Sequence, residues 1–205
     1  MTQVKADISM SLDGCVAGPD DNPGQGLGVG GEQLHEWVVG LASWRERHGM
    51  EGGEKSADGA VLEEAFATTG AILMGRRMFD LAERPWGDDP PFRMPVFVVT
   101  HHPRETIVKD GGTSFTFVGD GIERALELAR EAAGSADVSV AGGADVIRQL
   151  LSAGLLDELQ VHVVPILLGG GVRLFEGLGQ DVRFEQTRAI ASPGVTHLKL
   201  RVVRP

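Results

Sequence analysis

The chain is poor in cysteine, in basic side chains and in long apolar runs. Cys15 is the single cysteine among 205 residues, which excludes an internal disulfide and a multi-cysteine metal site. The 19 Lys and Arg residues are outnumbered by 29 Asp and Glu, and a net charge of −10 argues against duplex nucleic acid, which needs a basic face. No apolar run approaches the ~20 residues of a membrane helix. The start MTQVKADISM also lacks the pattern of a signal peptide, so we expect a cytoplasmic protein with no membrane partner.

Several motifs of common active sites are also missing. Neither of the two strand-to-helix junctions described below matches GxGxxG, and HExxH and GxSxG are absent, so a standard Rossmann site, a zinc protease and a hydrolase elbow are not supported. The six histidines are spread along the chain. His101 and His102 are adjacent, and neighbouring side chains of a strand point in different directions. We therefore expect no metal site.

Glycine, by contrast, is abundant. The chain has 29 glycines, about twice the usual share of ~7%, which predicts many tight turns or places where the backbone approaches another group closely. The length fits one domain, and we expect residues 1–205 to form it without internal repeats. Within this domain, residues 19–59 read as an elaborated loop–helix–loop. Its stretch GQGLGVGG (24–31) is interpreted as a mobile lid or insertion, because no strand directly precedes it.

Hydrophobic periodicity predicts alternating strands and helices. Strands are expected at 4–10, 15–18, 71–74, 94–100, 114–118, 137–141, 158–169, 182–191 and 195–203. Helices are expected at 32–49, 60–69, 76–82, 121–134 and 144–154, and RPWGDDPPF (84–92) is expected to be irregular because it holds three prolines and a glycine. The order indicates an α/β fold with a mostly parallel central sheet, flanked by helices and ending in an antiparallel hairpin.

Two strand-to-helix junctions suggest a binding site. The stretch ILMGRRMFD (72–80) places Arg76 and Arg77 directly after Gly75, and DVSVAGGADVIRQLL (137–151) runs from a strand through two glycines into a helix. Helix N-termini bind phosphate, and such junctions meet at the carboxyl edge of a parallel sheet. The two junctions could hold a dinucleotide pyrophosphate, with the arginines taking a further phosphate. The alternative is that the arginines are simply exposed and the double glycine is a tight turn.

Six segments together carry a family resemblance. They are SLDGCVAG (11–18), ILMGRRMF (72–79), VFVVTHHP (96–103), VAGGADVIRQLL (140–151), GLLDELQVHVVPILLGGGVRLFE (154–176) and the final hairpin. In this order they resemble the dihydrofolate reductase-like superfamily, in particular the stand-alone relatives of the C-terminal reductase domain of the riboflavin-biosynthesis deaminase-reductase. The resemblance runs nearly end to end. It implies a dihydrofolate reductase-like fold, NADPH as cofactor and a homodimer.

The resemblance also implies which residues bind the cofactor. Those beside the nicotinamide would be Ser9, Val16, Ala17 and Gly18. Those at the phosphates would be Gly75, Arg76, Arg77 and Met78, with Thr100 and His101 shaping the pocket for the 2′-phosphate. Those at the pyrophosphate would be Gly142, Gly143, Ala144, Asp145 and Val146. On this interpretation the two arginines select NADPH, since charge-assisted pairing with phosphate suits arginine.

The substrate side is less well defined by the sequence. Asp13 matches an acidic residue near the substrate of the riboflavin reductases and is the candidate for assisting protonation, although Asp-Gly is also a common turn. Those reductases usually carry a lysine six positions earlier, where this chain has Asp7. That departure weakens the case for a phosphoribosylamino-pyrimidine substrate. Trp86 is expected at a pocket edge, and His162 lies on a strand that faces the cleft in the family, although a buried histidine with satisfied partners is the alternative.

Two tryptophans on the 32–49 helix remain ambiguous. Trp37 and Trp44 share an apolar face with Leu34, Val38 and Leu41, which indicates the core. They could instead stack against a flat heterocycle. The function that the residues favour is an NADPH-dependent reductase of a small pteridine- or pyrimidine-like heterocycle. The alternatives are 5-amino-6-(5-phosphoribosylamino)uracil reductase of riboflavin biosynthesis and a non-enzymatic nucleotide-binding protein.

Overall fold

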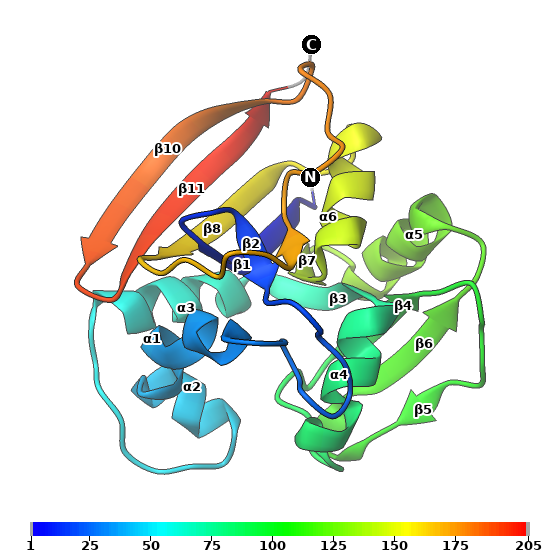
Figure 1. Cartoon of the computed structure of the whole chain (residues 1–205). Helices are drawn as coiled ribbons and strands as arrows, with labels where there is room; N and C mark the ends of the chain where they lie inside the picture. The colour runs from blue at the N-terminus through cyan, green and yellow to red at the C-terminus, as the bar shows by residue number, and fades with distance from the viewer. Residues whose placement is uncertain (1, 204–205) are drawn as a thin grey trace.

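A nine-stranded sheet with the order β10-β11-β8-β1-β7-β3-β4-β6-β5 forms the centre of the computed structural model, which describes residues 2–203 (Figure 1). Its strands are β1 Val4–Ser11, β3 Thr69–Gly75, β4 Pro95–Val99, β5 Ile107–Val108, β6 Ser114–Val118, β7 Asp137–Gly142, β8 Glu158–Val164, β10 Arg183–Ser192 and β11 Val195–Val203. From β8 to β6 neighbouring strands run parallel. The pairs β8–β11, β10–β11 and β5–β6 are antiparallel. The predicted mostly parallel sheet with a C-terminal hairpin is thus confirmed.

Helices cover both faces of this sheet because alternate residues of each strand point to opposite sides. On one face, Val4 and Ala6 pack in a core with α5 (Ile122–Ala133) and α6 (Ala144–Ser152). On the other face, Ile72 and Met74 pack against Phe79 of α4 (Arg76–Trp86). This second face also carries α3 (Ala57–Ala67) and three short helices, which are η1 Gly31–His35, α1 Glu36–Val39 and α2 Ala42–Arg47 (Figure 1).

The expected single helix over 32–49 is wrong. The segment divides into η1, α1 and α2, and Leu41 between the last two is extended, with φ −74° and ψ 140°. The break arises because the backbone bonds here to the following loop, with Glu54 N donating to Gly40 O at 2.9 Å and Ala42 N to Glu54 O at 2.9 Å. Glycine is a poor helix former, so Gly40 yields easily to these tertiary bonds.

The expected irregularity from residue 84 is also wrong at its start. Helix α4 continues to Trp86 with Pro85 inside it. Pro85 lies in the last turn, where it removes one backbone hydrogen bond of the helix, and Gly87 ends α4 directly after Trp86. The predicted strand over 158–169 stops at Val164, and Pro165 follows directly.

Three very short elements were not predicted. The predicted strand over 15–18 is present as β2 (Cys15–Ala17), and it forms a separate antiparallel pair with the first of the three, β9 (Val172–Arg173). The other two are β5 and η2 (Asp110–Gly112). Elements of two or three residues show no hydrophobic period, so the sequence carries little signal for them.

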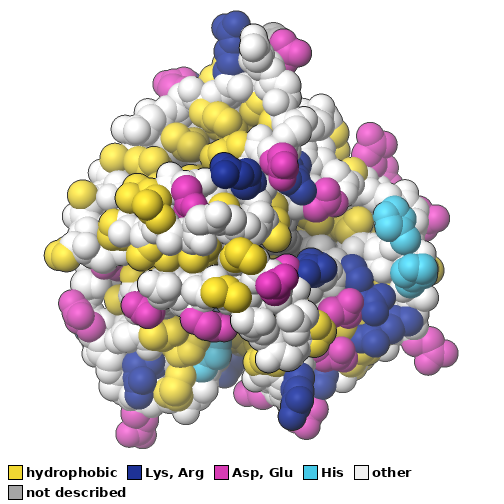
Figure 2. Space-filling view, in the orientation of Figure 1, with side chains coloured by type: hydrophobic (Ala, Val, Ile, Leu, Met, Phe, Trp, Pro, Cys, Tyr) yellow, Lys and Arg dark blue, Asp and Glu magenta, His cyan; other side chains and the backbone are white. Residues whose placement is uncertain are grey.

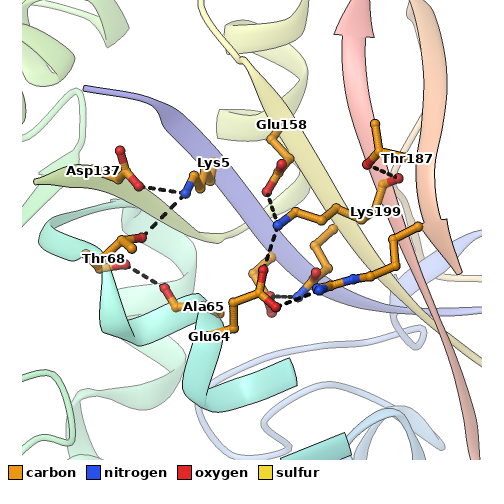
Figure 3. Close-up of polar contacts among 12 residues, drawn as sticks. Lys5, Glu64, Ala65, Thr68, Asp137, Glu158, Thr187 and Lys199 are labelled. Carbon is orange, nitrogen blue, oxygen red and sulfur yellow. Dashed lines mark hydrogen bonds and ion pairs between the residues drawn. The ribbon is translucent and has the colours of Figure 1, made fainter. Parts of the chain in front are cut away.

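Ion pairs tie α3 to the sheet (Figure 3). Lys199 of β11 contacts Glu64 of α3 at 2.9 Å and Glu158 of β8 at 3.2 Å, and Arg188 of β10 contacts Glu64 at 2.7 Å. On β1, Lys5 pairs with Asp137 at 2.6 Å. The contacts of Glu64 place α3 across β8 and β11, where Leu62, Ala65 and Phe66 line the smaller of the two cavities described below. Among the helices of residues 2–203, none combines the length and apolar character that crossing a membrane would need.

Candidate functional site

A cavity of about 760 Å³, here called the large cavity, lies at the carboxyl ends of the parallel strands. It is bordered by the ends of β1, β3, β4 and β7 and by the first residues of α4 and α6, whose lining residues include Ser9, Gly75, Thr100, Gly142 and Ala144. The carboxyl edge of a parallel sheet is the usual ligand site of such folds. Figure 2 shows basic side chains gathered beside histidines over α4 and β6. A volume of this size accommodates a large cofactor.

Three helices begin at this cavity without a side-chain cap. The residues before α4, α5 and α6 are Gly75, Gly121 and Gly143, and none of them can supply a capping oxygen. All three line the large cavity. The first N–H groups of each helix therefore lack a capping side chain and carry partial positive charge. Such helix starts are suited to a phosphate or pyrophosphate group.

The space at Gly143 tests whether a dinucleotide fits. A side-chain Cβ built on Gly143 would meet no heavy atom within 4 Å, so it would project into open space next to the start of α6. At Gly75, by contrast, a Cβ would lie 3.2 Å from Val146 Cγ2. A glycine at this position therefore allows the two junctions to lie close together. The peptide bond between Gly142 and Gly143 is cis. The residues present thus fit a pyrophosphate lying between the two junctions.

The two arginines of the first junction point in different directions. Arg76 Nε contacts Asp80 at 2.7 Å, and its Nη1 donates to the carbonyl of His102 at 3.3 Å and reaches the Thr100 hydroxyl at 3.5 Å. Arg76 therefore lies beside the end of β4, where the 2′-phosphate is expected. Arg77 instead pairs with Asp21 in the loop before η1, and this hydrogen bond raises the pKa of Arg77.

Most residues that the resemblance assigns to the cofactor line the large cavity. They are Ser9, Val16, Ala17, Gly75, Arg76, Arg77, Met78, Thr100, His101, Gly142, Gly143, Ala144, Asp145 and Val146. Gly18 does not line it. A Cβ on Gly18 would lie 2.0 Å from Val29 O, and its N–H donates to Leu27 O at 2.8 Å, so this glycine is needed for close packing of the loop. The cofactor role of the set remains a prediction.

Asp13, the residue predicted to assist protonation, lines neither the large cavity nor the smaller one described next. Its carboxylate accepts backbone hydrogens from Leu168 at 3.1 Å and Gly169 at 2.7 Å and a hydroxyl hydrogen from Ser11. These bonds, that of Ser11 first, lower the pKa of Asp13 to about 2. The geometry thus makes Asp13 an anchor between two loops and does not support a role in proton transfer.

A second cavity of about 300 Å³, here called the aromatic cavity, adjoins the large one. The two share the lining residues Ile8, Ser9, His35, Met78, Trp86 and Ala141. Trp37, Trp44, Trp86, Phe66 and Phe92 supply its aromatic lining. The expectation of Trp86 at a pocket edge matches this position. Trp37 and Trp44 were expected in the core, but they are half-buried and line the cavity. This position agrees with the alternative in which they stack against a flat heterocycle.

Asp7 and His162 lie side by side in the aromatic cavity. His162 is 2% exposed, and its Nε2 lies 2.7 Å from Asp7 Oδ1, while Gln160 Nε2 donates to Asp7 Oδ2 at 2.9 Å. Burial alone raises the pKa of Asp7. The charge and hydrogen bond of His162, with smaller effects of Gln160 and His197, outweigh burial and hold that pKa below its ordinary value. The cavity therefore presents a carboxylate. Both ring nitrogens of His162 have hydrogen-bond partners, and the residue also lines the cavity.

Sequence reasoning missed two further lining residues. His35, at the end of η1, borders both cavities. Burial, and then the charge of His162, lower its pKa to about 4, so its imidazole is neutral at pH 7. Asp21 lines the large cavity while it pairs with Arg77. Both residues belong to the 19–59 segment. The sequence of this segment has no hydrophobic pattern that would indicate how it packs against the sheet.

Solved structures with this architecture define the fold. A protein of Shewanella sp. PV-4, provisionally assigned to riboflavin biosynthesis, is 23% identical and matches over 100% of both chains with a TM-score of 0.70. A Thermotoga maritima diaminohydroxyphosphoribosylaminopyrimidine deaminase/5-amino-6-(5-phosphoribosylamino)uracil reductase is 16% identical with a TM-score of 0.61, over 98% of this chain and 57% of that one. Dihydrofolate reductase from Enterococcus faecalis, complexed with NADP(H), is 13% identical with a TM-score of 0.57, over 98% and 96%. The fold is therefore dihydrofolate reductase-like.

The sequence identifies the family within this fold. Residues 2–198 match the model of the family described as RibD C-terminal domain. The match covers nearly the whole chain, and the chain belongs to this family. The family resemblance carried by the six segments is thereby confirmed.

Proposed function

We propose that the chain is an NADPH-dependent reductase that transfers a hydride to a small pteridine- or pyrimidine-like heterocycle. The observation that carries this proposal is the contact between the two cavities. The large cavity gathers three uncapped helix starts, and it shares the lining residues Ile8, Ser9 and Met78, among others, with the aromatic cavity. A dinucleotide in the large cavity would thus bring its reactive ring to a flat, aromatic-lined space. When bound, the reduced nicotinamide supplies the hydride.

The residues of this chain would bind and orient both partners. The N–H groups after Gly75 and Gly143 would hold the pyrophosphate, and Arg76 with Thr100 would hold the 2′-phosphate. Trp37, Trp44 and Trp86 would stack on the heterocycle and exclude water. Aromatic walls confine a flat ring without demanding one substituent pattern, which is why the proposal names a class of substrate.

The alternative is 5-amino-6-(5-phosphoribosylamino)uracil reductase of riboflavin biosynthesis. The family assignment favours it, and so does Arg47, which lines the aromatic cavity with its guanidinium 3.7 Å from the centre of the Phe66 ring. Burial, followed by the nearby charge of Arg93, lowers the pKa of Arg47. A bound anion, such as a phosphate, would stabilise the charged guanidinium there. Asp7 argues against this substrate because it places an anion where the resemblance leads us to expect a lysine. A homodimer and a cytoplasmic location stay predictions.

The test is hydride transfer to a panel of acceptors. Purified protein and NADPH are mixed with pteridines, flavins and pyrimidines, including the phosphoribosylamino-uracil precursor, and loss of nicotinamide absorbance is followed. Turnover of a non-phosphorylated heterocycle supports the proposal. Turnover of the phosphorylated precursor alone, with rescue of a strain lacking that reductase, supports the riboflavin alternative. Tight NADPH binding without transfer to any acceptor indicates a non-enzymatic nucleotide-binding protein.

A further inference from the structure

A continuous line of hydrogen bonds runs from the aromatic cavity along one face of the sheet to helix α3. Asp7 Oδ1 lies 2.7 Å from His162 Nε2, His162 Nδ1 lies 2.6 Å from His197 Nδ1, and His197 Nε2 lies 3.0 Å from Asp58 Oδ1. The strands bring these groups together because His162 of β8 and His197 of β11 are direct partners in the antiparallel register. The four residues are called the Asp–His chain below.

The Asp–His chain must hold one proton more than its resting groups would. Each of its three contacts needs one hydrogen. Two neutral imidazoles carry two N–H hydrogens, and two carboxylates carry none. If both Nε2 hydrogens face the carboxylates, the two Nδ1 lone pairs would face each other at 2.6 Å, which is repulsive. A third hydrogen removes this conflict, so the chain carries a net charge of −1 in place of −2.

The two ends of the Asp–His chain meet different surroundings. His162 and His197 are 2% and 3% exposed in their side chains, whereas Asp7 is 28% and Asp58 17% exposed. Asp7 lines the aromatic cavity. Asp58 lies on α3 and also accepts a hydrogen bond from the Ser192 hydroxyl in β10. Two buried imidazoles thus connect one carboxylate in the cavity with another on α3, next to the β10–β11 hairpin.

We propose that the Asp–His chain stores a proton and delivers it through Asp7 to the ligand in the aromatic cavity. This inference rests on the proposed reductase, in which every hydride delivered must be matched by one proton. It assigns to Asp7 the role for which the sequence favoured Asp13. Asp7 touches the ligand and is the catalytic group. His162, His197 and Asp58 act through it as positioning residues.

The step balances as follows. The substrate carbon accepts a hydride from a reduced nicotinamide dinucleotide, and its C=N or C=O double bond becomes single. The adjoining nitrogen or oxygen takes a proton through the Asp7 carboxylate, to which His162 Nε2 gives up its hydrogen. The hydrogen between the two Nδ1 atoms then stays on His162, and the hydrogen on His197 Nε2 stays beside Asp58, so both imidazoles are left neutral. After the product leaves, one solvent proton returns through Asp7 to His162 Nε2, so one reduced substrate consumes one hydride and one solvent proton.

An aromatic ring and several charged groups surround the Asp–His chain. Trp37 packs against both imidazoles, with its ring centre 4.7 Å from that of His162 and 5.1 Å from that of His197. Burial, and the charge of His162, lower the pKa of His197, although its hydrogen bond to Asp58 opposes them. The other charged or titratable groups around the Asp–His chain are His35 of η1, Glu64 of α3, Glu158 of β8, Arg188 of β10 and Lys199 of β11.

The first experiment observes the stored proton in the ligand-free protein. Histidine labelled with ¹⁵N reports each ring nitrogen by NMR. Both Nε2 atoms should be protonated at pH 7, and one hydrogen should couple to both Nδ1 atoms. Asp58→Asn should lower the pH at which the pair loses this hydrogen by about one unit or more, because one carboxylate beside the pair is removed. Glu64→Gln removes the same charge from the same helix, but Glu64 contacts Lys199 and Arg188 only, and it should leave this pH unchanged.

The second experiment asks whether the proton reaches the cavity. The probe is 2-aminopyridine, a flat base whose ring nitrogen and amino group match a carboxylate edge. Its binding to the wild type should protonate the probe and change the histidine signals together, and Asp7→Asn should weaken binding about tenfold or more. Two unprotonated Nδ1 atoms, equal responses of Asp58→Asn and Glu64→Gln, or no binding of the probe would overturn the inference. Neither experiment uses NADPH, so a failure of the proposed reductase would be seen separately.

Discussion

Arg77 Nη2 lies 2.6 Å from Asp21 Oδ1, and this ion pair fastens the loop of residues 19–30 to the start of α4. A second contact joins Arg77 Nη2 to the Asp21 carbonyl. The same loop carries Gly26 and Leu27 into the lining of the large cavity. Arg77 therefore holds a wall of the cavity, whereas Arg76 remains beside the end of β4. Two adjacent cations in an acidic chain thus serve two different contacts.

Asp21→Asn should loosen this loop. The change removes the charge that Arg77 pairs with, and amide hydrogen exchange across residues 19–30 should become faster while exchange in β1 and β7 is unchanged. Asp20→Asn, a neighbouring change of the same charge, should have no comparable effect. Equal exchange in wild type and Asp21→Asn would show that the ion pair does not hold the loop.

Asp80→Asn should improve the preference for NADPH over NADH. Asp80 holds Arg76 Nε at 2.7 Å and competes with a phosphate for that guanidinium. An ion pair one turn apart on a helix contributes about 0.2–0.5 kcal/mol, so the ratio of the two Kd values should change by about twofold. Glu83→Gln, which removes a charge from the same helix but pairs with Arg104, is the control. A ratio that is the same in both variants would argue against Arg76 as the contact to the 2′-phosphate.

Gly143→Val should abolish dinucleotide binding without unfolding the protein. Its side chain would enter the open space at the start of α6, where the pyrophosphate is expected. Gly194→Val in the β10–β11 turn also meets no atom within 4 Å at the Cβ and should bind normally. Thermal melting confirms that both variants are folded. Normal NADPH affinity in a folded Gly143→Val protein would place the cofactor elsewhere.

His35→Asn should flatten the dependence of stability on pH. A histidine in the unfolded chain titrates near 6.5, whereas burial lowers the pKa of His35 to about 4 in the folded state. Between these values the unfolded chain binds a proton that the folded protein does not, so the free energy of unfolding of the wild type falls as pH falls through this window. Urea unfolding at pH 7 and pH 4.5 should show a smaller decrease for His35→Asn than for wild type or for His48→Asn. The same decrease in all three would show that His35 does not resist protonation.

Local sequence signals sufficed for the elements that build the large cavity. PVFVV over 95–99 is a run of β-formers, and α5 shows Ala125, Leu126 and Ala129 on its buried face before Gly134 ends it. Glycines at two strand-to-helix junctions indicated where a phosphate could bind, because the edge of a parallel sheet has a fixed geometry. The residues at 75–78 and 142–146 follow from these junctions, whereas the resemblance alone assigned Ser9, Val16, Ala17, Thr100 and His101.

Tertiary contacts decided what the sequence could not reveal. The helix breaks at Gly40 because its carbonyl bonds to Glu54, fourteen residues on. Asp7, His162 and His197 meet only through the register of β1, β8 and β11, and no spacing along the chain encodes that meeting. Asp13 matched a family motif, yet the loop at Leu168 and Gly169 takes both of its oxygens.

The most direct test of the central claim is a titration of the wild type with NADPH and with NADH, followed by nicotinamide fluorescence. The account predicts a Kd for NADPH at least about tenfold below that for NADH, since charge-assisted hydrogen bonds to a phosphate contribute about 1.5–3 kcal/mol. Arg76→Ala combined with Arg77→Ala should remove the difference. No binding of either dinucleotide to the folded protein would contradict the proposed reductase.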